Sequence, residues 1–396
     1  MHTFPVIRNF KDVEDQIDQY FYIAEKEGYK VVNYRVPCPD TFPDVTDVKT
    51  AIRRSFRGII FDSVTGDILR RPLDKFFNLN ERAETRIENL DLSKPHVIME
   101  KLDGSLISPF RVNGKLIWGT KLGATDIGEL AEEFVAKHTK YEIFAKTMLD
   151  ADISLIFEFV TNRNRIVLDY PEENLILIAM RNIRDGTYIP YDKMEHIASW
   201  HDIPVVKVFK SKKLTPDFVE ELRKQEGVEG IVVRFDDGLY LKCKTDWYCQ
   251  LHRVKSEINN ERCVVQLIIE GKIDDLKPIM LKEDVVKLEQ FEKDLWHVVN
   301  DRILRIQEVI DYIKEKNMSR KDFALTFNES AWLRVIVFSL WNDIETNGNA
   351  MRFWIIEEIK NSIVKNCGKN KNYDEMKATG ILNGLVDWKP VMFEEA

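Results

Sequence analysis

Residues 228–244 read VEGIVVRFDDGLYLKCK, and this stretch decides how the chain is expected to fold. Residues 228–235 and 239–244 are short runs rich in branched and aromatic side chains, which predict two β-strands. Successive side chains on a strand point to opposite faces, so Lys242 and Lys244 share one face and can reach one ligand. These two cations mark the second strand as part of a candidate ligand site.

Similar strand-forming runs occur upstream, at residues 29–36, 57–62, 96–101, 154–160 and 174–180. An Asn-Gly turn at residues 113–114 joins two further β-prone runs and predicts a hairpin. Because the strands do not alternate strictly with helices, antiparallel sheets with flanking helices are favoured over a doubly wound sheet. The fold class expected for this part of the chain is therefore α+β.

Two helix starts can be read between these strands. Asp126 with Glu129 resembles a capping box, which predicts a helix that runs to about Leu149. Thr215 precedes Pro216, and threonine at the N-cap with proline at the first helical position is a typical helix start. These two helices are expected to flank the sheets.

The composition and residue pattern of the sequence change at about residue 250, beyond which glycines and strand signals become rare. Residues 283–316 carry apolar side chains at helical spacing, and Ser319 with Asp322 predicts the cap of a following helix. The helical pattern continues through residues 330–365. We therefore expect an α+β domain over residues 1–250 and an all-helical domain over residues 251–396.

The composition is that of a globular protein with an acidic balance. Charged residues make up 31% of the 396 positions, the net charge is −8, and the pI is about 5.6. Such a chain does not bind polyanions through its overall charge, so a phosphate site needs locally gathered lysines and arginines. The five cysteines form no CxxC pair, which argues against a disulfide framework and against a four-cysteine zinc site.

The start of the chain and its hydropathy predict a cytoplasmic protein. The first residues, MHTFPVIRNFKDVEDQ, lack the basic and then apolar layout of a signal peptide. No apolar run is long enough to cross a bilayer, so no membrane association is expected.

A candidate nucleophile lies in residues 101–105, which read KLDGS and follow a predicted strand. Lys101 can point its amine into a cleft there, and Gly104 allows a ligand to approach the backbone closely. A lysine is nucleophilic only when neutral, a form that burial and neighbouring cations favour. Taken alone, the segment is more typical of a surface turn. The chain has no GxxxxGK(S/T), GxGxxG or HExxH motif, so a P-loop kinase or an NAD enzyme finds no support.

Further signals follow this segment in order. Glu158 lies in IFEFV, Glu229 precedes a glycine in VEGIVV, and the two lysines alternate in LKCK. This order resembles the motifs of ATP-dependent ligases and capping enzymes, which are covalent nucleotidyltransferases. The strings KFFNLNE at 75–81, NRIVL at 164–168 and KCKTDWY at 242–248 narrow the resemblance. Over residues 30–280 the chain is similar to the RNA ligase 1 family of T-even bacteriophages.

The resemblance implies an adenylyltransferase domain and the ATP-dependent joining of 5′-phosphate and 3′-hydroxyl ends of single-stranded RNA. Lys101 would attack the α-phosphorus of ATP and carry AMP as a lysyl-AMP intermediate. The AMP would pass to the RNA 5′-phosphate, and the 3′-hydroxyl would then displace it. Lys242 and Lys244 would hold the α-phosphate and neutralise the charge that develops at phosphorus.

The resemblance also implies a set of ligand-binding residues. The nucleotide-binding set is Tyr34, Arg57, Lys75, Lys121, Glu158, Glu229, Lys242 and Lys244. Glu229 and Asp274 are implied to bind Mg²⁺ or Mn²⁺, which prefer carboxylate and phosphate oxygens. Ordinary alternatives stay open for four residues: a core position for Tyr34, a solvent-facing position for Glu158, a turn acid for Glu229 and a solvated turn for Asp274.

The partners implied by the resemblance are ATP and single-stranded RNA ends, in particular a broken tRNA anticodon loop prepared by a polynucleotide kinase-phosphatase. The basic segment 365–372 (KNCGKNKN) and Lys210, Lys212 and Lys213 are candidates for RNA contacts or for solvated surface. Residues 161–163 read TNR where the T-even pattern has a proline, so the local loop is expected to differ.

Two other functions stay open at this point. A DNA ligase or an mRNA guanylyltransferase shares the motifs, but those enzymes carry an OB-fold where this chain predicts helices. The other alternative is a non-catalytic RNA-binding protein on the same scaffold. The presence of every expected catalytic residue type argues against that reading.

Overall fold

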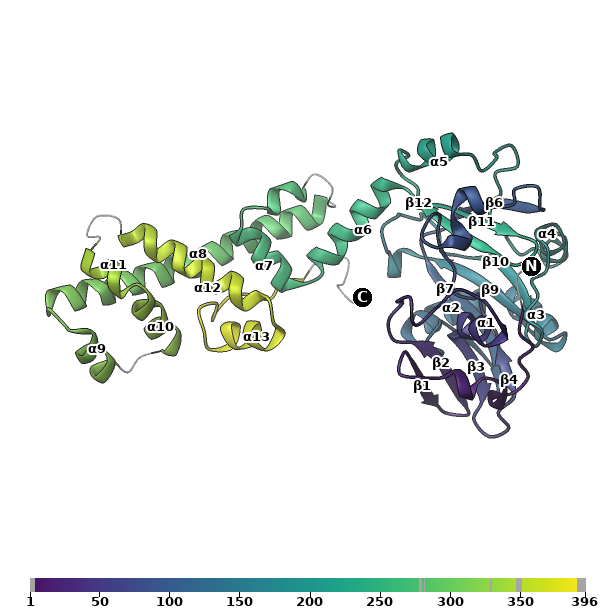
Figure 1. Ribbon diagram of the computed structural model, residues 1–396, viewed down its shortest axis with the longest axis horizontal. Helices are drawn as coiled ribbons and strands as arrows, with labels where there is room; N and C mark the ends of the chain where they lie inside the picture. The colour runs from purple at the N-terminus through teal and green to yellow at the C-terminus, as the bar shows by residue number, and fades with distance from the viewer. Residues whose placement is uncertain (1–3, 278–279, 281, 328–329, 347–350, 390–396) are drawn as a thin grey trace. The chain divides into compact units, whose positions relative to one another are not determined.

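The computed structural model describes residues 4–277, 280, 282–327, 330–346 and 351–389. The chain divides into two compact units, Met1–Cys249 and Gln250–Ala396, one residue from the expected division. Figure 1 shows sheets with flanking helices in the first unit and helices in the described part of the second, which confirms the predicted fold class. Among the described residues, none of the helices combines the length and apolar character needed to span a bilayer.

The N-terminal sheet has the order β1-β2-β3-β4, and every strand is antiparallel to its neighbours. Its strands are β1 (Phe21–Lys26), β2 (Tyr29–Tyr34), β3 (Arg57–Asp62) and β4 (Ile68–Arg70). The short turns η1 (Phe10–Asp12) and η2 (Glu14–Gln16) precede the sheet, and helix α1 (Val48–Ser55) leads into β3. Arg57 therefore opens an interior strand, whose backbone is held on both sides.

The second sheet has the order β10-β9-β7-β8. Its strands are β7 (Ser105–Val112), β8 (Lys115–Gly119), β9 (Ile153–Val160) and β10 (Asn174–Asn182). The predicted hairpin joins β7 and β8, where Asn113 and Gly114 have φ angles of 50° and 76°, as such a turn requires. Glu158 lies in β9 between Leu106 of β7 and Ile176 of β10, near the middle of the sheet.

The third sheet brings the predicted catalytic lysines together. Its order is β5-β12-β11-β6, built from β5 (Phe77–Asn78), β6 (His96–Lys101), β11 (Gly230–Phe235) and β12 (Tyr240–Lys244). Only the β5–β12 pairing in this sheet is parallel. Gly230 pairs with Lys101 on one side and with Lys244 on the other, so the two lysines flank a glycine.

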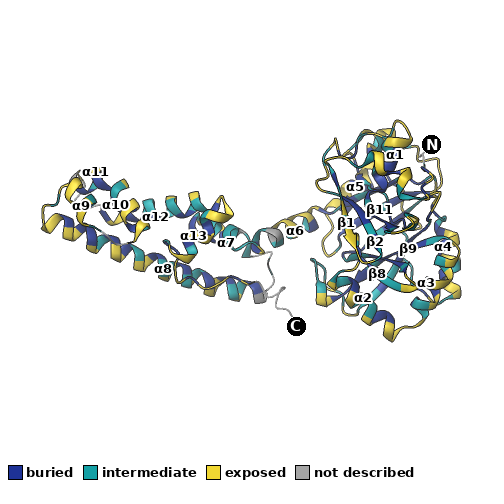
Figure 2. Cartoon of the chain, turned by 90° about the horizontal axis from the view of Figure 1, so that it is seen from below, coloured by how far each residue is buried: buried dark blue, intermediate teal, exposed yellow. Residues whose placement is uncertain are grey.

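The second and third sheets share one hydrophobic core. It includes Met99 and Tyr240 from the third sheet with Phe157 and Leu177 from the second. A separate cluster covers the other face of the third sheet, using helix α5 (Pro216–Arg223). In Figure 2 the buried positions of the first unit concentrate in these sheets. Because β6 is packed on both faces, the lysine at its end has a fixed backbone.

The helix predicted from residue 126 to about 149 is wrong in two respects. Thr125, one residue earlier than expected, is the N-cap, and its hydroxyl accepts a hydrogen bond from Gly128 N. The helix is also interrupted: α2 (Asp126–Lys137) ends at His138, whose φ of −132° is not helical, and α3 (Lys140–Asp150) begins anew. The cap at Thr215 with Pro216 is confirmed, and helix α4 (Tyr191–Trp200) was not predicted.

The described part of the second unit is helical. Its elements are α6 (Asp246–Ile258, which starts in the first unit), α7 (Glu261–Ile269), η6 (Ile273–Asp275), α8 (Lys282–Glu315), α9 (Arg320–Thr326), α10 (Ala331–Ser339), α11 (Trp341–Thr346), α12 (Met351–Cys367) and α13 (Asn370–Ala378). Helix α8 buries Leu288, Leu295 and Val299 as the predicted helical spacing requires. The capping box of Ser319 and Asp322 at α9 is confirmed.

Buried arginines join the parts of the first unit. Arg181 in β10 forms an ion pair with Asp74 at 2.6 Å between Nη2 and Oδ2, and Ser55 donates to the same carboxylate at 2.7 Å. Burial alone would raise the pKa of Asp74, but the charges of Arg181 and Arg71 outweigh it and lower the pKa to about 2. This carboxylate therefore connects helix α1 with the second sheet.

The remaining 3-10 turns are η3 (Ala83–Thr85), η4 (Ile87–Asn89) and η5 (Asn162–Asn164).

Candidate active site

Lys101 lies at the end of β6 and shares a carboxylate with Lys244. Lys101 Nζ is 2.7 Å from Glu229 Oε1, and Lys244 Nζ is 3.0 Å from the same oxygen. The Glu229 side chain is 3% exposed, whereas the Lys101 side chain is 20% exposed. The structure thus brings three predicted site residues into direct contact and keeps the amine of Lys101 accessible.

Two glycines make this approach of strands possible. Gly230 has a φ of +146°, and a Cβ there would lie 2.0 Å from the carbonyl oxygen of Cys243 in the neighbouring strand. A Cβ at Gly104 would lie 2.4 Å from the carbonyl oxygen of Phe159. Neither position can take a side chain without movement of backbone, so both glycines are needed to seat Lys101 beside its neighbours.

Lys242 belongs to the same group of cations. Its pKa is lowered to about 8, first because it is buried and then because Lys75, Lys101, Lys244 and Arg57 repel its charge. Its Nζ lies 5.6 Å from the centre of the Phe76 ring. Lys242 and Lys244 therefore gather with three further cations from other strands and loops, as a site for phosphate in an acidic protein requires.

Arg57 and Lys75 come to this group from the N-terminal part of the chain. The Nη1 atom of Arg57 is buried and has no hydrogen-bond partner among the described residues. Burial and the nearby Arg57 lower the pKa of Lys75, while Tyr34 opposes the shift. Lys121 Nζ lies 5.4 Å from the centre of the Tyr34 ring. These four of the eight residues predicted to bind the nucleotide therefore lie near one another.

Glu158 faces the group from β9. Burial raises its pKa to about 7, Glu229 adds to the rise, and Lys101 and Arg57 oppose it. A carboxyl group with this pKa changes charge near neutral pH, so it can donate or accept a hydrogen bond. Its side chain lines a cavity and is only partly exposed, so it does not face bulk solvent.

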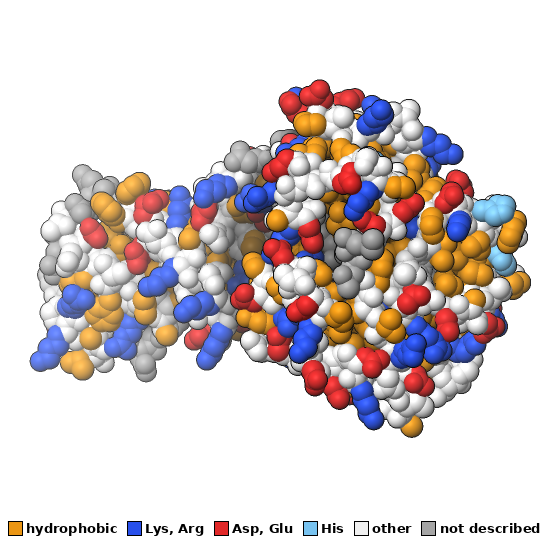
Figure 3. Space-filling view, turned by 45° about the vertical axis from the view of Figure 1, so that its right-hand side comes forward, with side chains coloured by type: hydrophobic (Ala, Val, Ile, Leu, Met, Phe, Trp, Pro, Cys, Tyr) orange, Lys and Arg blue, Asp and Glu red, His pale blue; other side chains and the backbone are white. Residues whose placement is uncertain are grey.

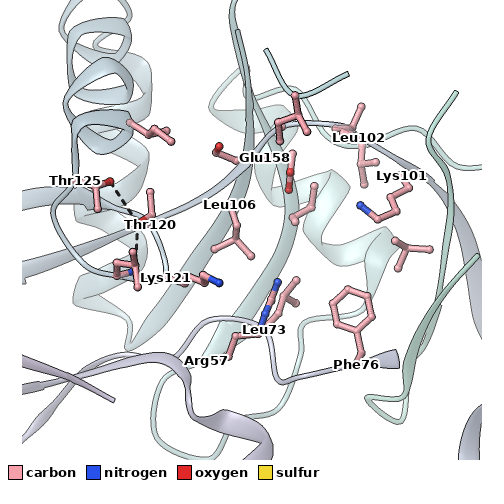
Figure 4. Close-up of a pocket in the computed structure, with 18 of the residues that line it drawn as sticks. Arg57, Leu73, Phe76, Lys101, Leu102, Leu106, Thr120, Lys121, Thr125 and Glu158 are labelled. Carbon is pink, nitrogen blue, oxygen red and sulfur yellow. Dashed lines mark hydrogen bonds between the residues drawn. The ribbon is translucent and has the colours of Figure 1, made fainter. Parts of the chain in front are cut away.

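A cavity of about 920 Å³ lies among four of these residues, whereas the described lining does not include Tyr34, Lys75, Glu229, Lys242 or Lys244. Lys101, Arg57, Lys121 and Glu158 line it, and Figure 4 shows the nitrogens of the three cations extending toward the same space. Apolar wall is supplied by Met99, Val206, Val232, Ile178 and Phe76. Ligand pockets typically have volumes of about 300–1,000 Å³. A cavity with one apolar wall and one cationic wall suits a nucleoside phosphate, because the base can pack on the apolar wall and the phosphates can contact the cations.

Positive charge is local, not general. On the face drawn in Figure 3, lysine and arginine side chains alternate with acidic ones. Among the residues outside the cavity, Lys210, Lys212 and Lys213 are exposed, and Lys212 Nζ lies 3.8 Å from Glu221. Segment 365–372 spans the end of α12 and the start of α13. The predicted RNA contacts of both groups stay predictions.

The described side chains supply only part of the ligands that a metal ion needs. In the described ranges no cluster of three or more His, Cys, Asp or Glu side chains could hold a metal ion. Glu158 and Glu229 nevertheless offer hard oxygens beside Lys101, which fits Mg²⁺, an ion that keeps several waters and binds substrate phosphates. Asp274 lies in the second unit, is 77% exposed and pairs with Lys277 at 2.8 Å. Its assignment to a metal stays a prediction.

Several residues of the site had no role in the sequence interpretation. Phe76, Met99, Ile178, Val206 and Val232 form the apolar wall, and Lys26 reaches the cavity from the first hairpin. Phe76 could have been found, because it stands inside the KFFNLNE string. Lys26 has no comparable signal. At the departure from the T-even pattern, Thr161 and Arg163 both bind Glu173, at 2.5 and 2.6 Å.

Comparison with known proteins gives two family matches. The profile of a family described as RNA ligase matches residues 55–252, and that of the family T4 RNA ligase 1, C-terminal domain, matches residues 255–373. A putative RNA ligase of Thermovibrio ammonificans is 27% identical over 324 residues, which are 78% of this chain and 81% of that protein.

Two further proteins are similar over shorter parts. A putative bifunctional polynucleotide kinase/RNA ligase of Autographa californica nuclear polyhedrosis virus is 28% identical over 244 residues. That match takes in 55% of this chain but only 34% of the viral protein. A solved archaeal ATP-dependent RNA ligase is 13% identical with a TM-score of 0.41, covering 63% of this chain and 64% of its own.

Proposed function

The chain belongs to the RNA ligase family, and on this basis we propose that it joins RNA ends at the expense of ATP, with Lys101 as the nucleophile. The observation that carries the proposal is the shared contact of Lys101 and Lys244 with Glu229 beside a cavity that fits a nucleotide. The proposed substrates are ATP and single-stranded RNA with a 5′-phosphate and a 3′-hydroxyl.

In the first step, Lys101 Nζ attacks the α-phosphorus of ATP, a bond forms between nitrogen and phosphorus, and pyrophosphate leaves. The amine gives up a proton in this step, and Glu229 Oε1, 2.7 Å away, is placed to accept it. Lys242, Lys244 and Arg57 stabilise the negative charge that builds up on the phosphate oxygens. Fixed cations in a partly dry cavity are among the largest contributions to such a reaction.

A divalent metal ion bound by Glu158 and Glu229 would supply further charge stabilisation at the phosphates. We assign the metal ion to these two residues because their carboxylate oxygens lie beside the nucleophile. Glu158, with a pKa of about 7, would also orient the ribose. Arg57, with its unpaired Nη1, is proposed to bind a nucleotide phosphate.

The second and third steps transfer AMP to the RNA 5′-phosphate and then release it as the 3′-hydroxyl attacks. We propose a broken tRNA loop as the natural RNA and a kinase-phosphatase as the enzyme that prepares its ends. The relative from Autographa californica nuclear polyhedrosis virus is named as a putative bifunctional polynucleotide kinase/RNA ligase, which supports this pairing. Since ATP and tRNA both occur in the cytoplasm, we infer that the protein acts there.

Intact mass after incubation with ATP and Mg²⁺ tests the first step. The native chain is expected to gain the mass of one AMP, and Lys101→Ala is expected to gain none. Lys115→Ala, which removes an exposed lysine of β8, serves as the matched control and is expected to form the adduct. A native chain without an adduct at any pH and metal, or an adduct that persists in Lys101→Ala, contradicts the proposal.

Sealing assays separate RNA ligation from DNA ligation. The native chain is expected to join single-stranded RNA ends, and Lys101→Ala is expected to join them only when the RNA already carries a 5′-adenylate. Faster joining of a nicked DNA duplex than of single-stranded RNA would contradict the proposed substrate.

A further inference from the structure

Asp103, two residues after the nucleophile, uses both oxygens of its carboxylate within the protein. Oδ1 accepts a hydrogen bond from the Tyr248 hydroxyl at 2.6 Å. Oδ2 accepts from the backbone N–H groups of Val167 and Leu168, both at 2.7 Å. The residue is 4% exposed, so its carboxylate is satisfied by these three donors and is closed off from solvent.

Tyr248, in the first turn of α6, contacts two parts of the site at once. Its hydroxyl donates to Asp103, and its ring lies 4.6 Å from Lys244 Nζ. Burial raises the pKa of Tyr248, and the charges of Glu229 and Asp103 raise it further, so the phenol keeps its proton and stays a donor. A cation above this ring face is held by the ring electrostatically.

The segment after η5 is fixed by the same carboxylate. Val167 and Leu168 follow Ile166, which lines the cavity, and Tyr170 accepts a hydrogen bond from Asp103 N at 2.9 Å. Asn164 adds a bond to Ser105 at 3.1 Å. One buried residue therefore connects the nucleophile turn, a wall of the cavity and the helix that follows the last lysine strand.

We infer that the hydrogen bond between Tyr248 and Asp103 positions Lys101 and Lys244 relative to each other for attack on the α-phosphate. Both are positioning residues, because their side chains form hydrogen bonds within the protein and affect the reaction only through the placement of Lys101 and Lys244. The inference rests on the proposed function, since it concerns the step in which Lys101 is adenylylated. Its physical basis is that misplacement of a reacting group by 1 Å costs on the order of 100-fold in rate.

Tyr248→Phe tests the inference, because it removes only the hydroxyl and keeps the ring beneath Lys244. The first-order rate of Lys101 adenylylation at saturating ATP is expected to fall about 10- to 100-fold. The apparent KM for ATP is expected to change by less than about threefold, because the cavity wall and the cations stay in place. Sealing of RNA that already carries a 5′-adenylate, which needs no attack by Lys101, is expected to change little.

A matched control is Tyr141→Phe, which removes another hydrogen-bonded hydroxyl from the core of the same unit. Tyr141 is 1% exposed and donates to the carbonyl of Leu175 at 3.0 Å, outside the cavity. Its loss should lower thermal stability by a similar amount and leave adenylylation unchanged. The double variant Asp103→Asn/Tyr248→Phe should be no slower than the slower single variant, because both act through one bond.

Each other outcome is decisive. A native rate of adenylylation in Tyr248→Phe overturns the inference. Equal losses of adenylylation and of sealing of adenylylated RNA, in proportion to lost thermal stability, would show a structural role and overturn it as well. A native chain that forms no AMP adduct refutes the proposed function before any variant is compared, so the two failures are distinguishable.

Discussion

Glu158 and Lys242 are two groups of the site that change charge near neutral pH. The pKa of Glu158 is about 7 and that of Lys242 is about 8, and in both cases burial disfavours the charged form. The carboxylate form of Glu158 therefore exists above about pH 7, and the charged form of Lys242 exists below about pH 8. Both charged forms coexist only in a narrow window.

The pH profile of adenylylation is expected to report this window. The kcat/KM for ATP should rise through about pH 7 as Glu158 ionises and fall through about pH 8 as Lys242 loses its proton. Glu158→Gln should lower the plateau by about 10-fold, remove the acid limb and keep the alkaline limb. Rates of adduct formation measured across pH give both limbs.

The control for this profile is Glu129→Gln, which changes an exposed carboxylate on α2 and should keep both limbs. An acid limb that persists in Glu158→Gln would assign it to another group.

Some of these residues could be predicted from the sequence. The alternation in LKCK placed Lys242 and Lys244 on one face, and both now lie in the cation group. The sequence did not reveal that Glu229 would contact Lys101, because residues so far apart in the chain meet only through strand pairing. Buried arginines such as Arg70 were equally hidden, because the carbonyl groups that bind it come from other strands, Gly58 in β3 and Ser108 in β7.

At the scale of the elements, the close packing of strands β6, β11 and β12 depends on a single glycine, Gly230. Gly230 lies in β11 between Lys101 in β6 and Lys244 in β12, and its φ of +146° is one that other residues rarely adopt. A methyl group there would meet the backbone of Cys243 at 2.0 Å. Any substitution therefore has to move β12 or β11, and with them a lysine.

Gly230→Ala is expected to destabilise the first unit by at least about 2 kcal/mol through backbone strain and the clash. It should also reduce AMP adduct formation to the level of Lys101→Ala. The measurements are denaturant unfolding and intact mass with ATP. Gly227→Ala is the matched control: its φ is +77°, but no atom of the described residues lies within 4 Å of the added carbon.

Gly227→Ala should therefore cost only about 1 kcal/mol for the left-handed backbone and leave the adduct intact. Equal effects of the two substitutions would mean that the close approach of strands is unimportant.

The strands were easier to predict than the helix boundaries. Residues 57–62 and 96–101 form β3 and β6 with the expected ends, because apolar runs between turn residues leave little choice. Strand β5 has two residues and carries no such signal, since it exists only by pairing with β12. The break between α2 and α3 was missed because both halves carry apolar residues at helical spacing, and His138 is no strong helix breaker.

For the molecule as a whole, the stability of the first unit depends on a largely buried ion pair between Asp74 and Arg181. Asp74 receives hydrogen bonds from Arg181 of β10 and from Ser55 of α1, so it connects parts distant in the sequence. Removing one partner of a buried pair leaves the other charge without compensation. Of the two compact units, the first contains Asp74, so the effect of its loss belongs to that unit.

Asp74→Asn is expected to destabilise the first unit by about 3 kcal/mol. Because the pKa of Asp74 is lowered to about 2, its contribution is present at neutral pH and is lost as the pH falls from about 4 to about 2. Urea unfolding at neutral and acid pH, followed in the full chain, measures the difference, which should shrink at the lower pH.

Asp150→Asn is the control for this pair. Asp150 pairs with Arg111 at 2.8 Å, but the two side chains are 64% and 41% exposed, so the loss should be near zero. A stability difference between native and Asp74→Asn that stays constant down to pH 2 would exclude the proposed charge effect.

The order of strands in the third sheet has a consequence for protein synthesis. Strand β6, with Lys101, is translated early, but its neighbours β11 and β12 come from the last part of the first unit. In a nascent chain whose residue 244 is still inside the ribosome, Lys101 does not yet have Lys242 and Lys244 beside it. Ligase activity should therefore switch on only when the first unit is fully synthesised, and a prematurely terminated chain would be inert toward ATP.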